Sequence, residues 1–216
     1  MKNYILITLF SSVLLTISCK KKEILESTIV KVPTIALIGN PVFSTSAGGG
    51  TYSDPGAIVS DESAGQTINL STPTETDIDL STPGLYTAKY KYKTKYGFDL
   101  SASRLVLVTS VDPEEDLSGT YARASNGQEV NITKVGAGLY KTDNVGGVAG
   151  DDSFIYDVYF GLPDDSTLVL PAQITSKGEE IASEDAAIIR SGSDITLQWV
   201  VIGSAYGTAL RKFIKQ

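Results

Sequence analysis

The sequence predicts an all-β protein with two antiparallel β domains. Short runs rich in Thr, Val, Ile and Tyr recur along the chain, and Gly, Pro, Asn, Asp and Ser bound them, as is typical of strands and turns. Helical periodicity is weak throughout. A charged stretch that contains Pro113 separates two sets of these runs, and it predicts an interdomain linker at 111–116.

The expected strands follow the apolar runs in chain order. In the first half they are Thr34–Ile38, Ala57–Val59, Thr67–Leu70, Thr76–Leu80, Tyr86–Tyr96 and Ser103–Thr109. In the second half they are Gly119–Ala124, Gln128–Val135, Leu139–Thr142, Phe154–Phe160, Thr167–Leu170, Ala186–Arg190, Ile195–Ile202 and Ala209–Ile214. Residues 177–186 are compatible with a short helix or an acidic loop, and Asn126-Gly127 favours a type I′ turn.

The first 18 residues have the pattern of a secretion signal. A basic start at Lys2 precedes an apolar run at 4–17, which is too short to span about 30 Å of hydrocarbon. Ser18 then precedes the single cysteine, Cys19. This pattern resembles a bacterial lipoprotein signal, which implies cleavage before Cys19, lipidation there and anchoring in the outer membrane. Residues 19–32 carry four Lys and two Glu and predict a tether.

Composition narrows the function classes. The 216 residues include no histidine, which excludes Ser-His-Asp and Cys-His catalytic sites and His-ligated metals. One cysteine allows no internal disulfide. The formal net charge of −7 disfavours nucleic-acid binding, because contacts to phosphates need clustered Lys and Arg. Most of the negative charge lies in residues 111–216, which carry eight basic and sixteen acidic residues.

The run Tyr86–Tyr96 predicts a strand with two different faces. Small or aromatic residues and Thr94 fall on one face, and four lysines, at 89, 91, 93 and 95, fall on the other. A solvated face is the favoured interpretation of the lysines, and binding of an acidic glycan or partner is the alternative. Gly84, two residues before Tyr86, matches the tyrosine corner of immunoglobulin-like sandwiches, in which the Tyr hydroxyl bonds to upstream backbone.

Three segments together resemble a bacterial Ig-like domain over residues 33–110. They are TYSDPGA at 51–57, STPGLYT at 81–87 and SRLVLV at 103–108. The resemblance implies a β-sandwich of the kind that serves as a spacer, adhesive or carbohydrate-associated module on surface proteins.

Four carboxylates of this domain could meet at one end of a sandwich. Asp54 and Asp61 are the candidate cation-binding residues, with Asp77 and Asp79 as further acidic neighbours. The favoured interpretation is that Asp54 caps the turn at Asp54-Pro55-Gly56 while the others are solvated.

The second domain, 117–216, opens with Leu117-Ser118-Gly119-Thr120-Tyr121 and continues through about eight short strands. Short connections between them predict an antiparallel barrel or sandwich. The opening resembles lipocalin-like and related all-β C-terminal domains of lipoproteins from Bacteroidetes. The whole arrangement resembles lipoproteins found with outer-membrane glycan-import machinery, which implies polysaccharide and transporter components as partners.

Exposed aromatic rings are candidates for a glycan site, because sugars stack on them. Tyr159, with Asp157 on the same strand face, is the first candidate, with a solvated strand face as the favoured interpretation, and Tyr121 and Tyr140 are further candidates. Trp199 shares a face with apolar residues, so we expect it in the core with a partner for its indole N–H. The glycine-rich segment 146–152 is expected to form a mobile rim.

These features predict a lipid-anchored, non-catalytic envelope protein that binds glycan or supports a polysaccharide-uptake complex. The alternative is a structural lipoprotein in which the Ig-like module is a spacer and the C-terminal domain docks a protein partner. We expect no enzyme activity, because the pairs Asp151-Asp152 and Asp164-Asp165 diverge on an extended chain. No cofactor and no metal are expected, and surface or periplasmic orientation is left open.

Overall fold

The fold is taken from a computed structural model that describes residues 31–62, 64–203 and 206–216. These residues form fifteen strands and one 3₁₀ turn (Asp152–Phe154) without an α-helix, which confirms the all-β class. Within the same ranges no helix is long and apolar enough to cross a membrane. The predicted signal peptide, Cys19 and most of the tether lie outside the described residues.

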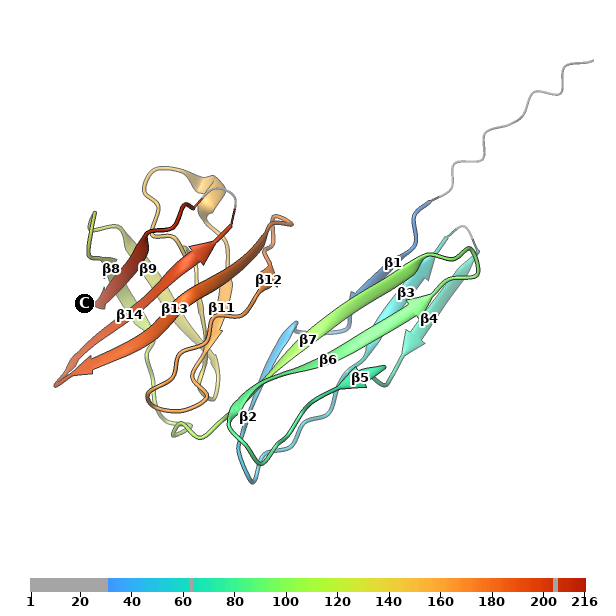
Figure 1. Cartoon of the computed structure of the whole chain (residues 1–216), viewed down its shortest axis with the longest axis horizontal. Coiled ribbons are helices and arrows are strands. Elements are labelled where there is room, and N and C mark those ends of the chain that lie inside the picture. The colour runs from blue at the N-terminus through green and yellow to red at the C-terminus, as the bar shows by residue number, and fades with distance from the viewer. Residues whose placement is uncertain (1–30, 63, 204–205) are drawn as a thin grey trace, which may run out of the picture. The chain divides into compact units, whose positions relative to one another are not determined.

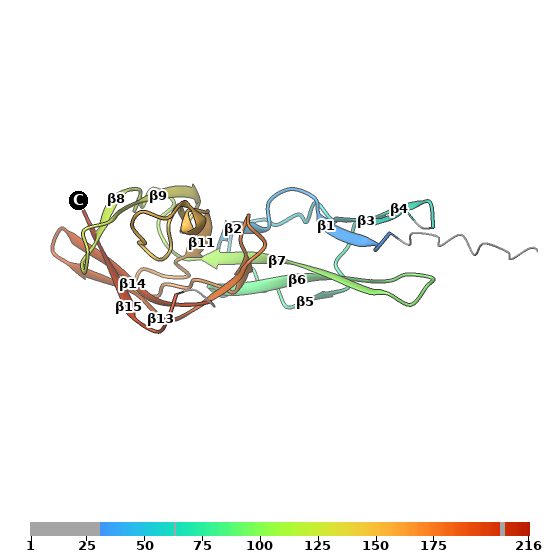
Figure 2. The ribbon, with the colours of Figure 1, turned by 90° about the horizontal axis from the view of Figure 1, so that it is seen from above.

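The first domain is a sandwich of two sheets, which Figure 2 shows as separate layers. All neighbouring strands are antiparallel except β2 and β7, which run parallel. One sheet has the order β1 (Thr34–Leu37), β3 (Ala57–Asp61) and β4 (Gln66–Leu70). The other has the order β2 (Val42–Ser46), β7 (Asp99–Thr109), β6 (Gly84–Lys93) and β5 (Glu75–Thr76).

Strand β6 has the two faces that its alternation predicts. Ala88 and Tyr90 are buried, whereas Lys91 and Lys93 are exposed. Tyr96 departs from the prediction and is 57% exposed. The reason is that the strand ends at Lys93 and the chain turns, with the amide of Thr94 donating to the carbonyl of Phe98 (2.9 Å) and Gly97 at φ 89°.

The predicted tyrosine corner is present, and the second domain repeats its hydrogen bond. The hydroxyl of Tyr86 donates to the carbonyl of Thr82 at 2.8 Å. A Cβ at Gly84 would lie 3.3 Å from the ring of Tyr86, so a glycine lets the ring fold back over the chain. In the second domain the hydroxyl of Tyr121 donates to the carbonyl of Leu117, also four residues upstream and also at 2.8 Å.

The second domain is a nearly closed, eight-stranded antiparallel barrel (Figure 1). The first and last strands pair with each other, so the seam lies between two strands from the middle of the domain. The strand order is β11 (Val158–Gly161), β10 (Leu139–Thr142), β9 (Glu129–Gly136), β8 (Gly119–Arg123), β15 (Leu210–Lys215), β14 (Asp194–Ile202), β13 (Glu180–Ser191) and β12 (Gln173–Ile174).

One side chain bridges the seam of the barrel. The amide of Gln173 on β12 accepts from the backbone N–H of Tyr159 and donates to its carbonyl, each at 2.8 Å. A backbone bridge between Gly161 and Val169 adds a second link. The side chain of Gln173 therefore satisfies both backbone polar groups of Tyr159, as a neighbouring strand would otherwise do.

Aromatic rings fill the barrel core. Tyr140, Phe160, Trp199 and Phe213 follow one another with ring centroids 5.6, 5.8 and 4.8 Å apart, and all four are fully buried. The indole N–H of Trp199 donates to the carbonyl of Val145 at 2.8 Å, which confirms its predicted place in the core. Packing of this kind leaves the centre of the barrel occupied by side chains.

Several local predictions are wrong. Residues 180–186 belong to β13 and form neither a helix nor an acidic loop, and Asp185, at φ 53°, lies where the register with β14 shifts. The loop at 126–127 is not type I′, because Gly127 has positive φ and Asn126 does not. Strand β2 is additional to the prediction, and Thr167–Leu170 contributes only the bridge at Val169.

The glycine-rich segment 146–152 is packed at its start and exposed at 149–152. Gly146 and Gly147 are buried. The carbonyl of Gly147 accepts from the side chains of Arg123 (3.2 Å) and Asn126 (3.1 Å). A Cβ at Gly146 would meet the ring of Tyr206 at 2.5 Å, so the close approach of this ring requires glycine.

Candidate functional site

Strand β7 contributes to two cores at once. Arg104, Val106 and Val108 point to one face of the strand, and all three are buried. Leu107, on the opposite face, is also fully buried and clusters with Val42 of β2 and Leu139 of β10. The run Leu105–Val108 therefore lacks polar alternation because both of its faces are covered.

Glycines of the barrel allow the contact with β7. A Cβ at Gly161 would lie 2.7 Å from the side chain of Leu107, and one at Gly138 would lie 2.7 Å from the hydroxyl of Thr109. The hydroxyl of Thr109 donates to the carbonyl of Leu162 at 2.6 Å. The amide of Ser110 donates to the carbonyl of Pro163 at 2.9 Å. Sandwich and barrel thus share one tightly packed interface.

A groove of about 680 Å³ lies beside this interface, and we call it the junction groove. Apolar side chains from β1 and polar side chains from β7 meet residues of β11 and β12 there. Its lining comprises Ile35, Leu37, Gly39, Pro41, Val42, Ser101, Ala102, Ser103, Leu105, Asp157, Tyr159, Ala172, Gln173, Ile174, Thr175 and Ser176. The volume is within the range of small-molecule sites.

The first candidate pair from the sequence lies in this groove. Tyr159 is half-buried and packs against the cluster around Leu107, whereas Asp157 is exposed. The ammonium of Lys141 on β10 pairs with the carboxylate of Asp157 at 2.6 Å. The hydrogen bond to Asp157 raises the pKa of Lys141, so the lysine stays charged beside the groove. A ligand in the groove would therefore meet the exposed part of the Tyr159 ring and the Lys141–Asp157 ion pair.

The two other tyrosine candidates are core residues, which corrects their assignment. Tyr121 and Tyr140 are both 0% exposed, so neither ring has a surface open to a ligand. Their hydroxyls instead hold the start of the domain. Tyr140 donates to the carbonyl of Glu115 at 3.0 Å and accepts from the amide of Leu117 at 3.4 Å.

The carboxylate of Asp54 is part of a buried ion pair. It lies 3.1 Å from Nε of Arg104, whose side chain is fully buried, and it also accepts from the hydroxyl of Tyr52. The amide of Gly56 donates to it at 2.8 Å, which is the predicted turn cap. Burial raises the pKa of Asp54, but these hydrogen bonds and the charge of Arg104 outweigh it and hold the pKa below its usual value.

The guanidinium of Arg104 also ties the start of the domain to the sandwich. It donates to the carbonyls of Ile38 (2.8 Å), Asn40 and Gly56 (3.0 Å). The conspicuous residues of the TYSDPGA and SRLVLV segments thus form one buried network. The residue types in these two segments are therefore accounted for by their structural role in the sandwich.

Asp61 is likewise engaged in local structure. It is only 3% exposed, and its carboxylate accepts from the amide of Ala64 in the following turn at 3.0 Å. In the described ranges no three residues among His, Cys, Asp and Glu are grouped closely enough to hold a metal ion. The geometry therefore gives Asp54 and Asp61 structural roles.

One comparison with known proteins agrees with the architecture of the first domain. Residues 36–108 match the family model of the Ig-like domain of bacterial surface proteins, which confirms the predicted Ig-like domain there. The crystal structure of a lipoprotein from Bacteroides thetaiotaomicron is similar with 21% identity and a TM-score of 0.39, over 86% of this chain and 100% of that one. No curated protein sequence matches the chain.

Sequence reasoning found Tyr159 and Asp157 but missed the other walls of the groove. Ser101 and Ser103 belong to a strand that was expected to start later, and Ile35 and Leu37 belong to a short exposed one. A usable signal was present in Leu105–Val108, because four consecutive apolar residues indicate a strand buried on both faces.

Proposed function

We propose that the protein is a lipid-anchored, non-catalytic component of the cell envelope that binds a polysaccharide in the junction groove. The observation that carries the proposal is the position of Tyr159 and Asp157 in the junction groove, at the interface of the two domains. An Ig-like domain of the bacterial surface type supports the envelope location.

The chemistry of the groove suits a sugar. The Tyr159 ring provides an apolar surface with a polar tip. The exposed hydroxyls of Ser101 and Ser103 make no hydrogen bond within the described residues and are free to bond to a ligand. Ile35 and Leu37 add apolar surface opposite these groups. A pocket of mostly apolar walls with a few convergent polar groups is the usual form of a ligand site.

The anchor and the partners belong to the same proposal. Cys19 carries the lipid that holds the protein in the outer membrane, where the chain acts as an accessory of a polysaccharide-uptake system. The support is the signal pattern that ends at Ser18-Cys19 and the lysines that follow it, which favour anionic headgroups.

The test uses the mature chain with Cys19→Ser, which removes the predicted acylation site and leaves the rest intact. Affinity gel electrophoresis against a panel of plant, microbial and host polysaccharides should show retardation by at least one polymer. Tyr159→Ala and Ser103→Phe should abolish it, the first by removing the ring and the second by filling the groove. Tyr96→Ala, which removes an exposed ring outside the groove, is the matched control and should bind normally.

Two results would overturn the proposal. One is a wild-type chain that no polysaccharide retards, and the other is unchanged binding by folded Tyr159→Ala and Ser103→Phe. The first result would favour the alternative, in which the Ig-like module is a spacer and the barrel docks a protein of the envelope. Stoichiometric co-purification from membranes with one defined complex would then identify that role.

A further inference from the structure

The register of β6 and β7 places lysines on the same sheet face as the serines of the junction groove. Lys89 is opposite Ser103, Lys91 is opposite Ser101, and Lys93 is opposite Asp99. Residues directly opposite each other in an antiparallel pair project to one face. Along β6 these lysines are about 7 Å apart, since a strand rises about 3.4 Å per residue. We call Lys89, Lys91 and Lys93 the lysine row.

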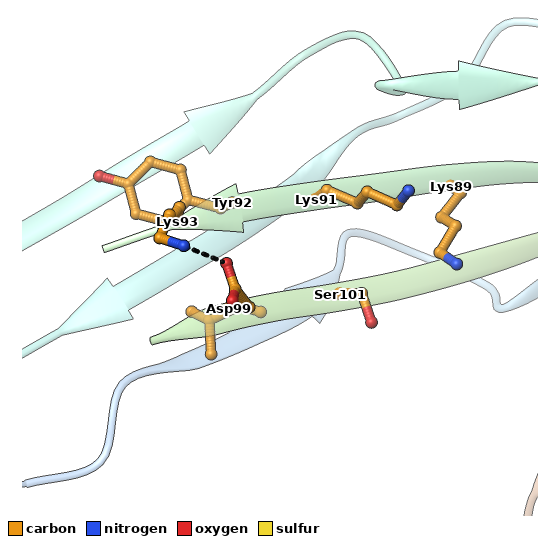
Figure 3. A pocket seen from close by; sticks show the side chains of 7 residues that line it. Lys89, Lys91, Tyr92, Lys93, Asp99 and Ser101 are labelled. Atoms are coloured by element: carbon orange, nitrogen blue, oxygen red, sulfur yellow. Dashed lines mark ion pairs between the residues drawn. The ribbon is translucent and has the colours of Figure 1, made fainter. Parts of the chain in front are cut away.

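The lysine row borders a hollow that continues the junction groove. A shallow groove of about 350 Å³ is lined by Lys89, Lys91, Tyr92, Lys93, Asp99, Leu100 and Ser101. Figure 3 shows these side chains along the two strands, with Lys93 and Asp99 paired. Ser101 lines both grooves. The two hollows therefore form one surface that runs from Tyr159 at the domain interface along β7 to the lysine row.

The charges of the row are available to a ligand. Lys91 pairs with Glu75 at 2.5 Å, with side chains 46% and 55% exposed, and Lys93 pairs with Asp99 at 3.4 Å with greater exposure. Exposed ion pairs of this kind are weak, so a ligand anion can replace the protein carboxylate. Lys89 lies opposite Glu75 of β5, which pairs with Lys91, and no ion pair joins Lys89 to a carboxylate within the described residues.

The backbone of the row is already paired, which determines how a ligand can be bound. Strand β6 pairs with β7 along its whole length. On its other edge, the carbonyl of Lys89 accepts from the amide of Thr74 at 2.8 Å, and the amide of Lys91 donates to the hydroxyl of Thr74 at 3.0 Å. An extended peptide thus finds no open ladder here. A ligand must lie on the sheet face and contact side chains, as a chain of sugar rings can.

We propose that the lysine row extends the junction groove and makes the site selective for an anionic polysaccharide, whose carboxylate or sulfate groups contact Lys89, Lys91 and Lys93. This inference rests on the proposed function and names the ligand class of the same site. The rings nearest Tyr159 occupy the junction groove, and the charged groups farther along the polymer follow the lysine row.

The experiment measures the affinity of the Cys19→Ser mature chain for four polymers by isothermal titration calorimetry. The polymers are polygalacturonate (carboxylate), dextran sulfate (sulfate), dextran (neutral) and polyglutamate (acidic peptide). We expect the acidic polysaccharides to bind more tightly than dextran, and added salt to weaken them because exposed charges are screened.

The variant that isolates the row is K89Q/K91Q/K93Q, which should weaken binding of the acidic polysaccharide roughly tenfold. K89R/K91R/K93R should retain it, since the charges remain. K95Q and K212Q are the matched controls, because neither lysine lines the two grooves, and each should bind like the unchanged chain. Because Lys91 and Lys93 are exposed, we expect these substitutions to leave the fold intact. Circular dichroism of each variant checks this.

The outcomes separate the inference from the proposed function. Equal binding of polygalacturonate by the unchanged chain and K89Q/K91Q/K93Q, with loss in Tyr159→Ala, overturns the anionic selectivity and leaves the glycan site intact. Polyglutamate that binds as tightly as polygalacturonate overturns the choice of a polysaccharide. Failure of every polysaccharide to bind overturns both.

Discussion

The two domains are both built from antiparallel strands, yet different interactions hold their interiors. The barrel core is a continuous set of apolar side chains around the rings of Phe160, Trp199 and Phe213. The sandwich instead buries a charged pair, Arg104 with Asp54, between its sheets. The barrel encloses the larger set of buried apolar side chains, and removal of this apolar surface from water stabilises it. A sandwich of small sheets depends more on a satisfied polar network, which is costly to break.

The largest effect is expected for Asp54→Ala, which removes the carboxylate of the buried pair in the sandwich. It leaves the Arg104 guanidinium buried without its carboxylate, so we expect a loss of about 3 kcal/mol in the free energy of unfolding of the sandwich. The chain has one tryptophan, Trp199, which reports on the barrel alone. Urea unfolding followed by circular dichroism should therefore show an early transition that tryptophan fluorescence does not follow. Coincident, unshifted transitions would show that the ion pair contributes little.

The same carboxylate predicts a pH dependence. Its folded pKa is lower than the ordinary value of 3.8, so the folded state prefers the ionised form. The corresponding stability is complete above about pH 4 and is lost as the pH falls through the lowered folded pKa. Asp54→Asn should flatten this acid-side loss in urea titrations between pH 5 and pH 2. An unchanged slope in Asp54→Asn would assign the loss to other carboxylates.

The third prediction concerns the interface that joins the two cores. In Gly161→Ala the new Cβ would meet Leu107 at 2.7 Å, so the leucine must shift, at a cost of about 1–2 kcal/mol. We expect the transitions of sandwich and barrel to move apart, since Leu107 links them. Gly49→Ala is the control, because no atom lies within 4 Å of a Cβ at Gly49, and it should be neutral. Equal effects of both substitutions would contradict a tight interface.

A smaller effect is expected at the two tyrosine–carbonyl hydrogen bonds, one in each domain. Tyr121→Phe leaves the carbonyl of the fully buried Leu117 without that donor, at a cost of about 1–2 kcal/mol. Tyr86→Phe releases the carbonyl of Thr82, which is exposed and can bind water, so about 0.5 kcal/mol is expected. Thermal unfolding of the two variants measures the difference. A larger loss of stability in Tyr86→Phe would contradict the idea that burial of the carbonyl determines the cost.

Local patterns predicted much of the fold, because a single strand already contains its own signal. The alternation at 86–96 and the Gly84–Tyr86 spacing gave the strand and the corner. Strand β2 was missed because it is short and three of its five residues are serine or threonine. The start of β13 escaped because Glu180, Glu184 and Asp185 have the composition of a loop, and only pairing with β14 makes them a strand.

The candidate site was half predictable for a different reason. Tyr159 and Asp157 share a face of one segment, which spacing reveals, whereas Tyr121 looks equally exposed in the sequence. Its burial depends on barrel closure through β8 and β15, a pairing of the two ends of the domain. The contiguity of Lys91 with Ser101 depends on strand register, which sequence spacing does not encode.

The parallel pairing of β2 with β7 has a mechanical consequence. Strand β2 follows the N-terminal part of the sandwich, and β7 leads directly into the barrel. A stretching force applied between the N-terminus and the barrel would pull these two strands along their length in opposite directions. The ladder from Val42↔Leu105 to Ser46↔Thr109 would then be loaded in shear, with its hydrogen bonds resisting together rather than opening one by one. The pairing of β2 with β7 would therefore give the sandwich mechanical resistance when it is pulled between its N-terminal end and the barrel.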